Sequence, residues 1–127
     1  MAEEEKDEFR KTETRQVVFN RMVPPMTGVV LQAACPLNGK ITEICYHFAP
    51  GANQLVQVAL RYGTTQISPL IGFISLDNAT PVFYIDQPCS GKEYFFLTIQ
   101  NTDILNPHTI SCVITVIGEH GPPIEKE

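Results

Sequence analysis

Charge is scarce in the middle of this 127-residue sequence. Residues 1–15 carry ten charges and residues 119–127 carry four of the 23 in the chain, which leaves nine for residues 16–118. That central stretch is about 9% charged, against roughly 25% for an average globular domain. Two explanations stay open: the outer surface is built from uncharged polar residues, or partners cover much of it, since interface cores are depleted in charge.

Other absences exclude whole classes of function. The net charge of −5 leaves too few clustered cations for phosphate binding, so we expect no nucleic-acid partner. No apolar run approaches membrane-spanning length, and the N-terminus is charged where a signal peptide needs an apolar core. We therefore expect synthesis in the cytoplasm and no membrane association. No phosphate loop, nucleophile elbow, H-E-x-x-H or dinucleotide fingerprint occurs, so we expect no enzymatic activity and no cofactor.

Proline and glycine interrupt the chain every ten or so residues, and short β-branched and aromatic runs lie between them. Within residues 54–62, Val56, Val58 and Leu60 alternate with more polar neighbours, a period of two that is typical of strands. The pattern predicts an all-β protein, an antiparallel two-sheet β-sandwich of about eight strands, with a jelly-roll or another Greek-key order. The predicted strands are 16–23, 28–34, 40–48, 54–62, 66–75, 81–85, 94–100 and 109–118.

The two ends of the chain differ from this central domain of residues 16–118. Residues 1–15 contain only one large apolar residue besides the initial Met, so they cannot bury enough surface to fold alone. We expect a charged, flexible N-terminal arm that orders against a partner, and a frayed C-terminal tail over residues 119–127. The residues of the arm that we expect to dock on a partner are Phe9, Arg10, Lys11 and Arg15.

Two pairs of metal-ligand residue types occur at strand spacing. Cys45 and His47 share one face of a predicted strand, and His108 and Cys112 share one face of another. Zinc takes four nitrogen or sulfur ligands, so a Cys2His2 site between two strands is one hypothesis. The simpler alternative is that Cys112, which lies among alternating apolar residues, is a buried thiol. The four cysteines show no C-x-x-C spacing, and without a secretory signal we expect free thiols.

The candidate oxygen ligands for calcium also have two interpretations. Asn101, Asp103 and Asn106 offer oxygens to calcium, but the same residues favour turns, and Asn106 precedes a proline. The carboxylates that glycoside hydrolysis would need sit beside turn residues, where acids are common for local reasons. They are Asp77, Asp86 and Glu93. We interpret both sets as turn formers.

Carbohydrate binding is the other function that β-sandwiches often serve. Sugar platforms use exposed aromatic rings, and this chain has no tryptophan. An exposed cluster among Tyr62, Tyr84 and Tyr94 would favour this function.

A charged arm followed by a compact sandwich, with "GKITEICYHFAPGANQLVQVALRYGTTQISP" and "GKEYFFLTIQNTDILNPHTISCVITV" as long strand pairs, resembles small virion surface proteins. These are the capsid decoration or auxiliary proteins and the receptor-binding heads of viruses and phages. The resemblance implies a homo-oligomer, commonly a trimer, that docks on a larger assembly such as a capsid. We therefore carry two hypotheses: a structural protein that self-associates and docks, and a ligand-binding sandwich that recognises a carbohydrate or small molecule through its loops.

Overall fold

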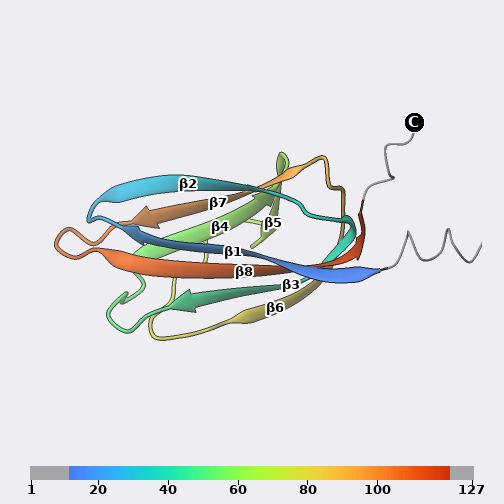
Figure 1. Ribbon diagram of the computed structural model, residues 1–127. Coiled ribbons are helices and arrows are strands. Elements are labelled where there is room, and N and C mark those ends of the chain that lie inside the picture. Colours follow the sequence, from blue (N-terminus) through green and yellow to red (C-terminus); the bar gives the residue numbers. More distant parts are fainter. Residues whose placement is uncertain (1–11, 121–127) are drawn as a thin grey trace, which may run out of the picture.

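Eight strands form two four-stranded antiparallel sheets in the computed structural model, which describes residues 12–120 (Figure 1). Sheet A has the order β1-β8-β3-β6 and sheet B the order β2-β7-β4-β5. The strands are β1 (Glu13–Val23), β2 (Thr27–Ala34), β3 (Asn38–Phe48), β4 (Val56–Tyr62), β5 (Thr65–Ser68), β6 (Val82–Cys89), β7 (Tyr94–Asn101) and β8 (His108–Glu119). The predicted antiparallel β-sandwich is confirmed, and its strand order is that of a jelly roll.

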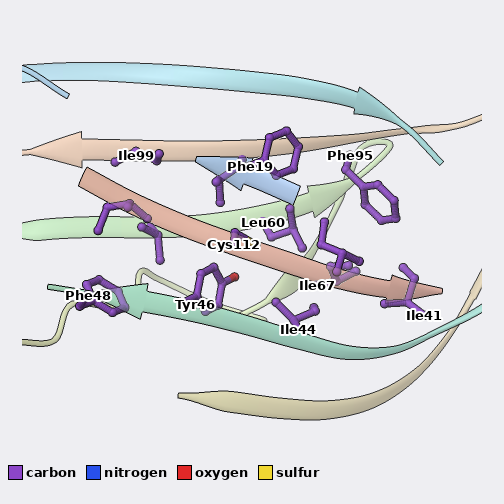
Figure 2. Close-up of a cluster of buried hydrophobic side chains, with 14 of the residues drawn as sticks. Phe19, Ile41, Ile44, Tyr46, Phe48, Leu60, Ile67, Phe95, Ile99 and Cys112 are labelled. Atoms are coloured by element: carbon purple, nitrogen blue, oxygen red, sulfur yellow. The ribbon is translucent and has the colours of Figure 1, made fainter. Parts of the chain in front are cut away.

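The core lies between the two sheets because each strand turns every second side chain inward (Figure 2). On β3, Ile44, Tyr46 and Phe48 are buried, and the residues between them face outward. The largest fully buried side chains are Tyr46, Phe48, Phe95, Leu37, Ile41, Ile44, Leu60, Leu97, Ile99, Ile110, Ile114 and Val23. Each such aliphatic or Phe side chain contributes about 1.5–3 kcal/mol through burial, so this layer dominates the stability of the fold.

A pair of glycines brings β3 and β8 close together at one end of sheet A. Gly39 stands opposite Gly118 in the ladder. A Cβ atom on Gly39 would overlap the backbone at Ile117, and one on Gly118 would overlap the carbonyl of Asn38. The close approach of the two backbones therefore requires glycine on both strands.

Several predicted strands differ in length by a few residues: β1 begins at Glu13, within the arm predicted for residues 1–15, and two other differences involve a proline. The strand expected over residues 66–75 ends at Ser68, because Pro69 cannot donate to a ladder and Gly72 has a φ of +85°. The strand expected to end at residue 85 continues to Cys89 and includes Pro88. This proline is tolerated because β6 is an edge strand, where a missing N–H on the open side costs no hydrogen bond.

The sandwich has a loop end and a strand-terminus end. At the loop end lie the connections 24–26, 49–55 and 102–107, which contact one another through backbone hydrogen bonds from Met26 to Asp103 and from Thr102 to Leu55. At the opposite end β1 begins and β8 ends side by side, with Glu13 paired to Gly118 (Figure 1). Within residues 12–120, no helix is long and apolar enough to cross a membrane.

Candidate functional site

The connection between β7 and β8 folds around the carboxylate of Asp103. Its Oδ1 accepts hydrogen bonds from the backbone N–H groups of Leu105 (2.9 Å) and Asn106 (3.2 Å). Its Oδ2 lies 2.8 Å from Nε2 of His108. The backbone hydrogen bond from Leu105, followed by the one from the His108 side chain, lowers the pKa of Asp103 to about 2. The carboxylate is therefore ionised under ordinary conditions and serves as the acceptor that organises this loop.

Asn101 extends the network to a second loop. Its Nδ2 donates to the carbonyls of Val23 (3.0 Å), Pro24 (3.2 Å) and Asn106 (3.0 Å), and its Oδ1 accepts from the N–H of Asp103 (3.0 Å). The side chain is almost completely buried, so these bonds form away from water. The amide thus ties the β1–β2 connection to the β7–β8 connection. Asn101 and Asp103 use their side-chain oxygens, and Asn106 uses its side-chain amide nitrogen, in hydrogen bonds within the loop, as turn formers do.

The structure separates the four zinc candidates into two groups. Cys112 is fully buried and faces Tyr46 in the core, and His108 contacts Asp103. Cys45 and His47 lie on the outer face of sheet A, because they are out of phase with the buried residues of β3. The sheet itself therefore stands between the two pairs. Among residues 12–120, no group of three or more His, Cys, Asp or Glu side chains is arranged to hold a metal ion.

All four cysteines are unpaired. The thiols of Cys35 and Cys89 both donate to the carbonyl of Leu37, at 3.3 and 3.8 Å. Burial raises the pKa of Cys89 to about 12, and the nearby Cys35 adds to the shift. Burial likewise raises the pKa of Cys112 to about 12. A nucleophilic cysteine needs a lowered pKa, so neither thiol has the environment of a catalytic one.

The three acidic residues considered for glycoside hydrolysis serve separate purposes. Asp77 accepts hydrogen bonds from the backbone N–H groups of Gly51 and Asn53, both at 3.0 Å, and so anchors the β3–β4 connection. Asp86 lies 3.5 Å from the ammonium of Lys40 on the surface of sheet A. Glu93 closes the β6–β7 turn through its backbone, at the opposite end from Asp77. They do not form the pair of facing carboxyl groups that this chemistry uses.

The tyrosines named for sugar binding also lie apart. Tyr62 packs on Phe95, with ring centroids 5.8 Å apart, and its hydroxyl bonds to the backbone of Ser90. Tyr84 lies exposed on β6 of sheet A, and Tyr94 lies half-exposed on β7 of sheet B. No ring in the described part of the chain stacks on Tyr84 or Tyr94. The described residues therefore form no shared platform from these three rings.

Of the four arm residues predicted to dock on a partner, only Arg15 is described. Its Nε lies 2.9 Å from Oε1 of Glu13, and its guanidinium approaches the ring of His120. The residue stands on β1 at the strand-terminus end, and its side chain is half-exposed. Phe9, Arg10 and Lys11 lie outside the described residues.

The outer faces of the two sheets account for the low charge of residues 16–118. Across sheet A, the register places an apolar row over all four strands, between rows rich in Thr, Ser, Asn and Gln. The apolar row consists of Val18, Val113, Cys45 and Val82. On sheet B, the outward positions of β2, β7 and β4 include one charge, Arg61, whose guanidinium lies 5.4 Å from the ring centroid of Phe96. Much of the outer surface is thus uncharged without any partner.

Sequence reasoning missed two exposed apolar patches. We call the exposed apolar residues of β6 and of the segment after β5 the edge patch: Leu70, Ile71, Phe73, Val82, Phe83 and Tyr84. The tip patch comprises Met22, Met26, Leu55, Ile104 and Leu105, at the loop end. The signal for the edge patch was present in the sequence: "PLIGF" is apolar but holds the Pro and Gly that prevent a strand, so its side chains have no sheet to pack under.

Each patch borders a hollow of comparable size. One of about 420 Å³ opens beside the edge patch between the segment after β5 and β6, and its lining is Ile67, Ser68, Pro69, Ile74 and residues 82–85. Another of about 410 Å³ lies at the loop end and is lined by Met26, Thr27, Gly28, Gln100, Asn101, Thr102 and Ile104. Both linings are mainly apolar and hold no charged side chain.

No protein-family model and no curated protein matches the sequence. Among solved structures, a chain of the Bacillus endospore appendages, which form a family of disulfide-linked pili, superposes with a TM-score of 0.52. The identity is 11%, over 88% of this chain and 91% of that chain. A mitogen from Yersinia pseudotuberculosis gives 0.46 at 11% identity, over 90% and 93% of the two chains. A chain in the structure of the Gx strain of infectious bursal disease virus gives a TM-score of 0.41 at 11% identity. The match covers 89% of this chain and 33% of that chain.

These likenesses concern the fold alone, because all three identities are far below 25% and two of the scores are below 0.5. The likeness to the endospore appendage chain supports the β-sandwich fold and indicates no specific family. The same sandwich carries many unrelated functions, so function has to be argued from the surface of this chain.

Proposed function

We propose that this protein is a non-enzymatic structural protein that self-associates and docks on a larger assembly through uncharged, apolar surface. The observation that carries the proposal is the presence of two separate exposed apolar patches on one small domain. The largest apolar patch on an ordinary monomer covers about 300–600 Å², and larger ones mark interaction sites. Two patches on different sides of the molecule suit a protein that makes two kinds of contact.

The two patches differ in the contact they suit. The edge patch follows a strand edge, where both side chains and backbone can engage a neighbour. The tip patch sits on loops, with Leu105 exposed to 76% and Ile104 to 71%. We assign self-association to the edge patch and docking on the larger assembly to the tip patch. A viral capsid or comparable lattice is the kind of assembly that we propose, with the chain made in the cytoplasm and then incorporated.

The chemistry of the interior agrees with a role without catalysis. The buried carboxylate of Asp103 is saturated by hydrogen bonds from its own loop, and the thiol of Cys112 is held protonated by burial. Such groups stabilise a fold, whereas a catalytic group needs a free position toward a substrate.

Measuring the mass of the full chain in solution tests the proposal. Light scattering after gel filtration, and native mass spectrometry over a hundredfold range of concentration, should give an oligomer. A clean monomer at every concentration would remove self-association from the proposal.

Docking through the tip patch has a separate test. Leu105→Asp places a charge on a residue that is exposed to 76%, so the fold and the self-association should persist. The variant should lose incorporation into the native assembly when it replaces the wild-type chain during assembly. Asn20→Asp, on the outer face of sheet A, is the matched control. Equal incorporation of both variants contradicts the role of the tip patch.

Ligand binding is the second candidate, and the hollow at the loop end is the observation that favours it. Its apolar lining includes the amide of Gln100 and the hydroxyl of Thr102, which is the mixture that small-molecule sites use. Binding of a carbohydrate on a glycan array, abolished by Gln100→Ala, would establish this function. An array without hits would remove its carbohydrate form.

A further inference from the structure

The first half of β6 has unused hydrogen-bonding groups along its outer edge. The N–H of Tyr46 on β3 donates to the carbonyl of Pro81, so the backbone groups of Pro81 point toward β3. Because N–H and C=O groups alternate in direction along an antiparallel strand, those of Phe83 also point toward β3 and those of Val82 and Tyr84 point away. Within residues 12–120, no backbone group pairs with Val82 or Tyr84 on that side.

The same edge is apolar and uncharged. Ile71 is exposed to 91% and Tyr84 to 78%, and the hollow that Val82, Phe83 and Tyr84 help to line is mainly apolar. At typical residue surface areas, the edge patch exposes on the order of 700–800 Å², which matches the roughly 800 Å² that each partner buries in a stable interface. A charged partner would find no complementary group here, whereas an identical patch brings no like charges together.

The other parts of the sheet A edges are protected. Beyond Asp86, Pro88 has no N–H to donate, which discourages strand addition at the end of β6. β1, the opposite edge, carries Glu13, Arg15 and Arg21. Along the two edges of sheet A, the stretch from Val82 to Tyr84 combines free backbone groups with exposed apolar side chains.

We propose that β6 pairs antiparallel with β6 of a second copy of this chain, about a two-fold axis at Tyr84. The N–H of Tyr84 donates to the carbonyl of Tyr84 in the second copy, and the reverse bond forms by symmetry. The two tyrosine rings become a cross-strand pair, and the same register places Val82 opposite Asp86 of the second copy. This inference rests on the proposed function and specifies which surface would carry its self-association. It favours a dimer over the trimer that the virion resemblance implies.

Ile71→Asp tests the side-chain half of the interface. The residue is almost fully exposed, so the variant should fold with an unchanged melting temperature at monomeric concentrations. Its dimer dissociation constant, measured by analytical ultracentrifugation of the full chain, should rise at least tenfold. Val30→Asp is the matched control, because Val30 is an exposed apolar residue on the outer face of sheet B, and its dimer should be unaffected.

Cross-linking tests the strand pairing. In a background of Cys45→Ser and Cys89→Ser, which removes the two partly exposed native thiols, Tyr84→Cys brings two thiols together at the two-fold axis. Residues directly opposite in an antiparallel ladder have Cα atoms about 4.5–5.5 Å apart, within the range of a disulfide. Copper-phenanthroline, with dissolved oxygen as the oxidant, takes two electrons and two protons from the two thiols and joins their sulfur atoms. A covalent dimer should form with Tyr84→Cys and not with Val30→Cys.

The results separate this inference from the proposed function. A monomeric wild-type chain overturns both. A wild-type oligomer that Ile71→Asp leaves intact, or that cross-links no better at Tyr84→Cys than at Val30→Cys, overturns only the β6 contact. A clean trimer also overturns the two-fold contact while leaving self-association in place.

Discussion

Nε2 of His108 lies 2.8 Å from Oδ2 of Asp103, and their side chains are only 11% and 10% exposed. This contact closes the loop that carries Ile104 and Leu105, two members of the tip patch. A loop fixed by buried hydrogen bonds presents its apolar side chains in one arrangement, so little conformational entropy remains to be lost when a partner binds. The polar network at the loop end therefore belongs to the proposed docking surface as its support.

Asn101→Ala should destabilise the protein by about 1–3 kcal/mol, because three carbonyl groups lose the amide that satisfies them in a buried position. Urea unfolding followed by circular dichroism measures the change. Asn20→Ala, on the exposed outer face of sheet A, is the control and should stay within about 0.5 kcal/mol of wild type. Equal effects of the two substitutions would contradict the role of the network.

Acid should weaken the fold through Asp103. Its pKa is lowered in the folded state from 3.8 to about 2, so its contribution is fully present above about pH 4 and is lost as the pH falls through about 2. The urea midpoint of the wild type should fall between pH 4 and pH 2 more steeply than that of Asp103→Asn, which has no carboxylate to protonate. Parallel curves for the two proteins would show that Asp103 has no such linkage.

Gly118→Ala should destabilise the protein by at least about 2 kcal/mol, because its Cβ overlaps the carbonyl of Asn38 and forces β3 and β8 apart. Gly28→Ala is the matched control in another strand, since its Cβ meets nothing closer than 3.5 Å. It should be neutral or stabilising by up to about 1 kcal/mol. Thermal unfolding of both variants measures the difference, and a tolerated Gly118→Ala would show that the two strands can separate without cost.

Cys89 and Cys112 should react slowly with a disulfide reagent at pH 8. A thiol whose pKa is raised from 9.0 to about 12 has about a thousandfold less thiolate at that pH, and thiolate is the reacting form. A colorimetric thiol titration with and without denaturant should show no more than two fast-reacting thiols in the folded protein and four in the unfolded protein. Four equally fast thiols in the folded state would contradict the raised pKa of these two thiols.

Periodicity predicted the central strands well because one face of each is fully buried. The alternation around Val56, Val58 and Leu60 reports the real division between core and outside. Alternation also places Cys45 and His47 opposite the buried face of β3, and His108 and Cys112 on the buried side of β8. Both strands belong to sheet A. Once the strand order is known, the alternation therefore places the pair on β3 and the pair on β8 on opposite faces of the same sheet.

The edge of the sandwich was harder to predict. Apolar residues from 66 to 75 look like a strand, although Pro69 ends β5 and leaves Leu70 and Ile71 in solvent. Sequence patterns assume that apolar side chains are inside, and that assumption fails for Leu70 and Ile71. The side-chain hydrogen bonds of Asn101 and Asp103 likewise depend on ring and amide orientations that no local pattern specifies.

The pairing of Glu13 with Gly118 brings the start of β1 and the end of β8 together, at the end of the sandwich opposite the tip patch. A circular permutant that joins these strand ends by a short linker and opens the chain in the β6–β7 turn would therefore keep every ladder of both sheets. By the same geometry, a cargo domain fused beside either strand end would point away from the loops. Under the proposed docking, the strand-terminus end would therefore stay accessible while a partner covers the tip patch.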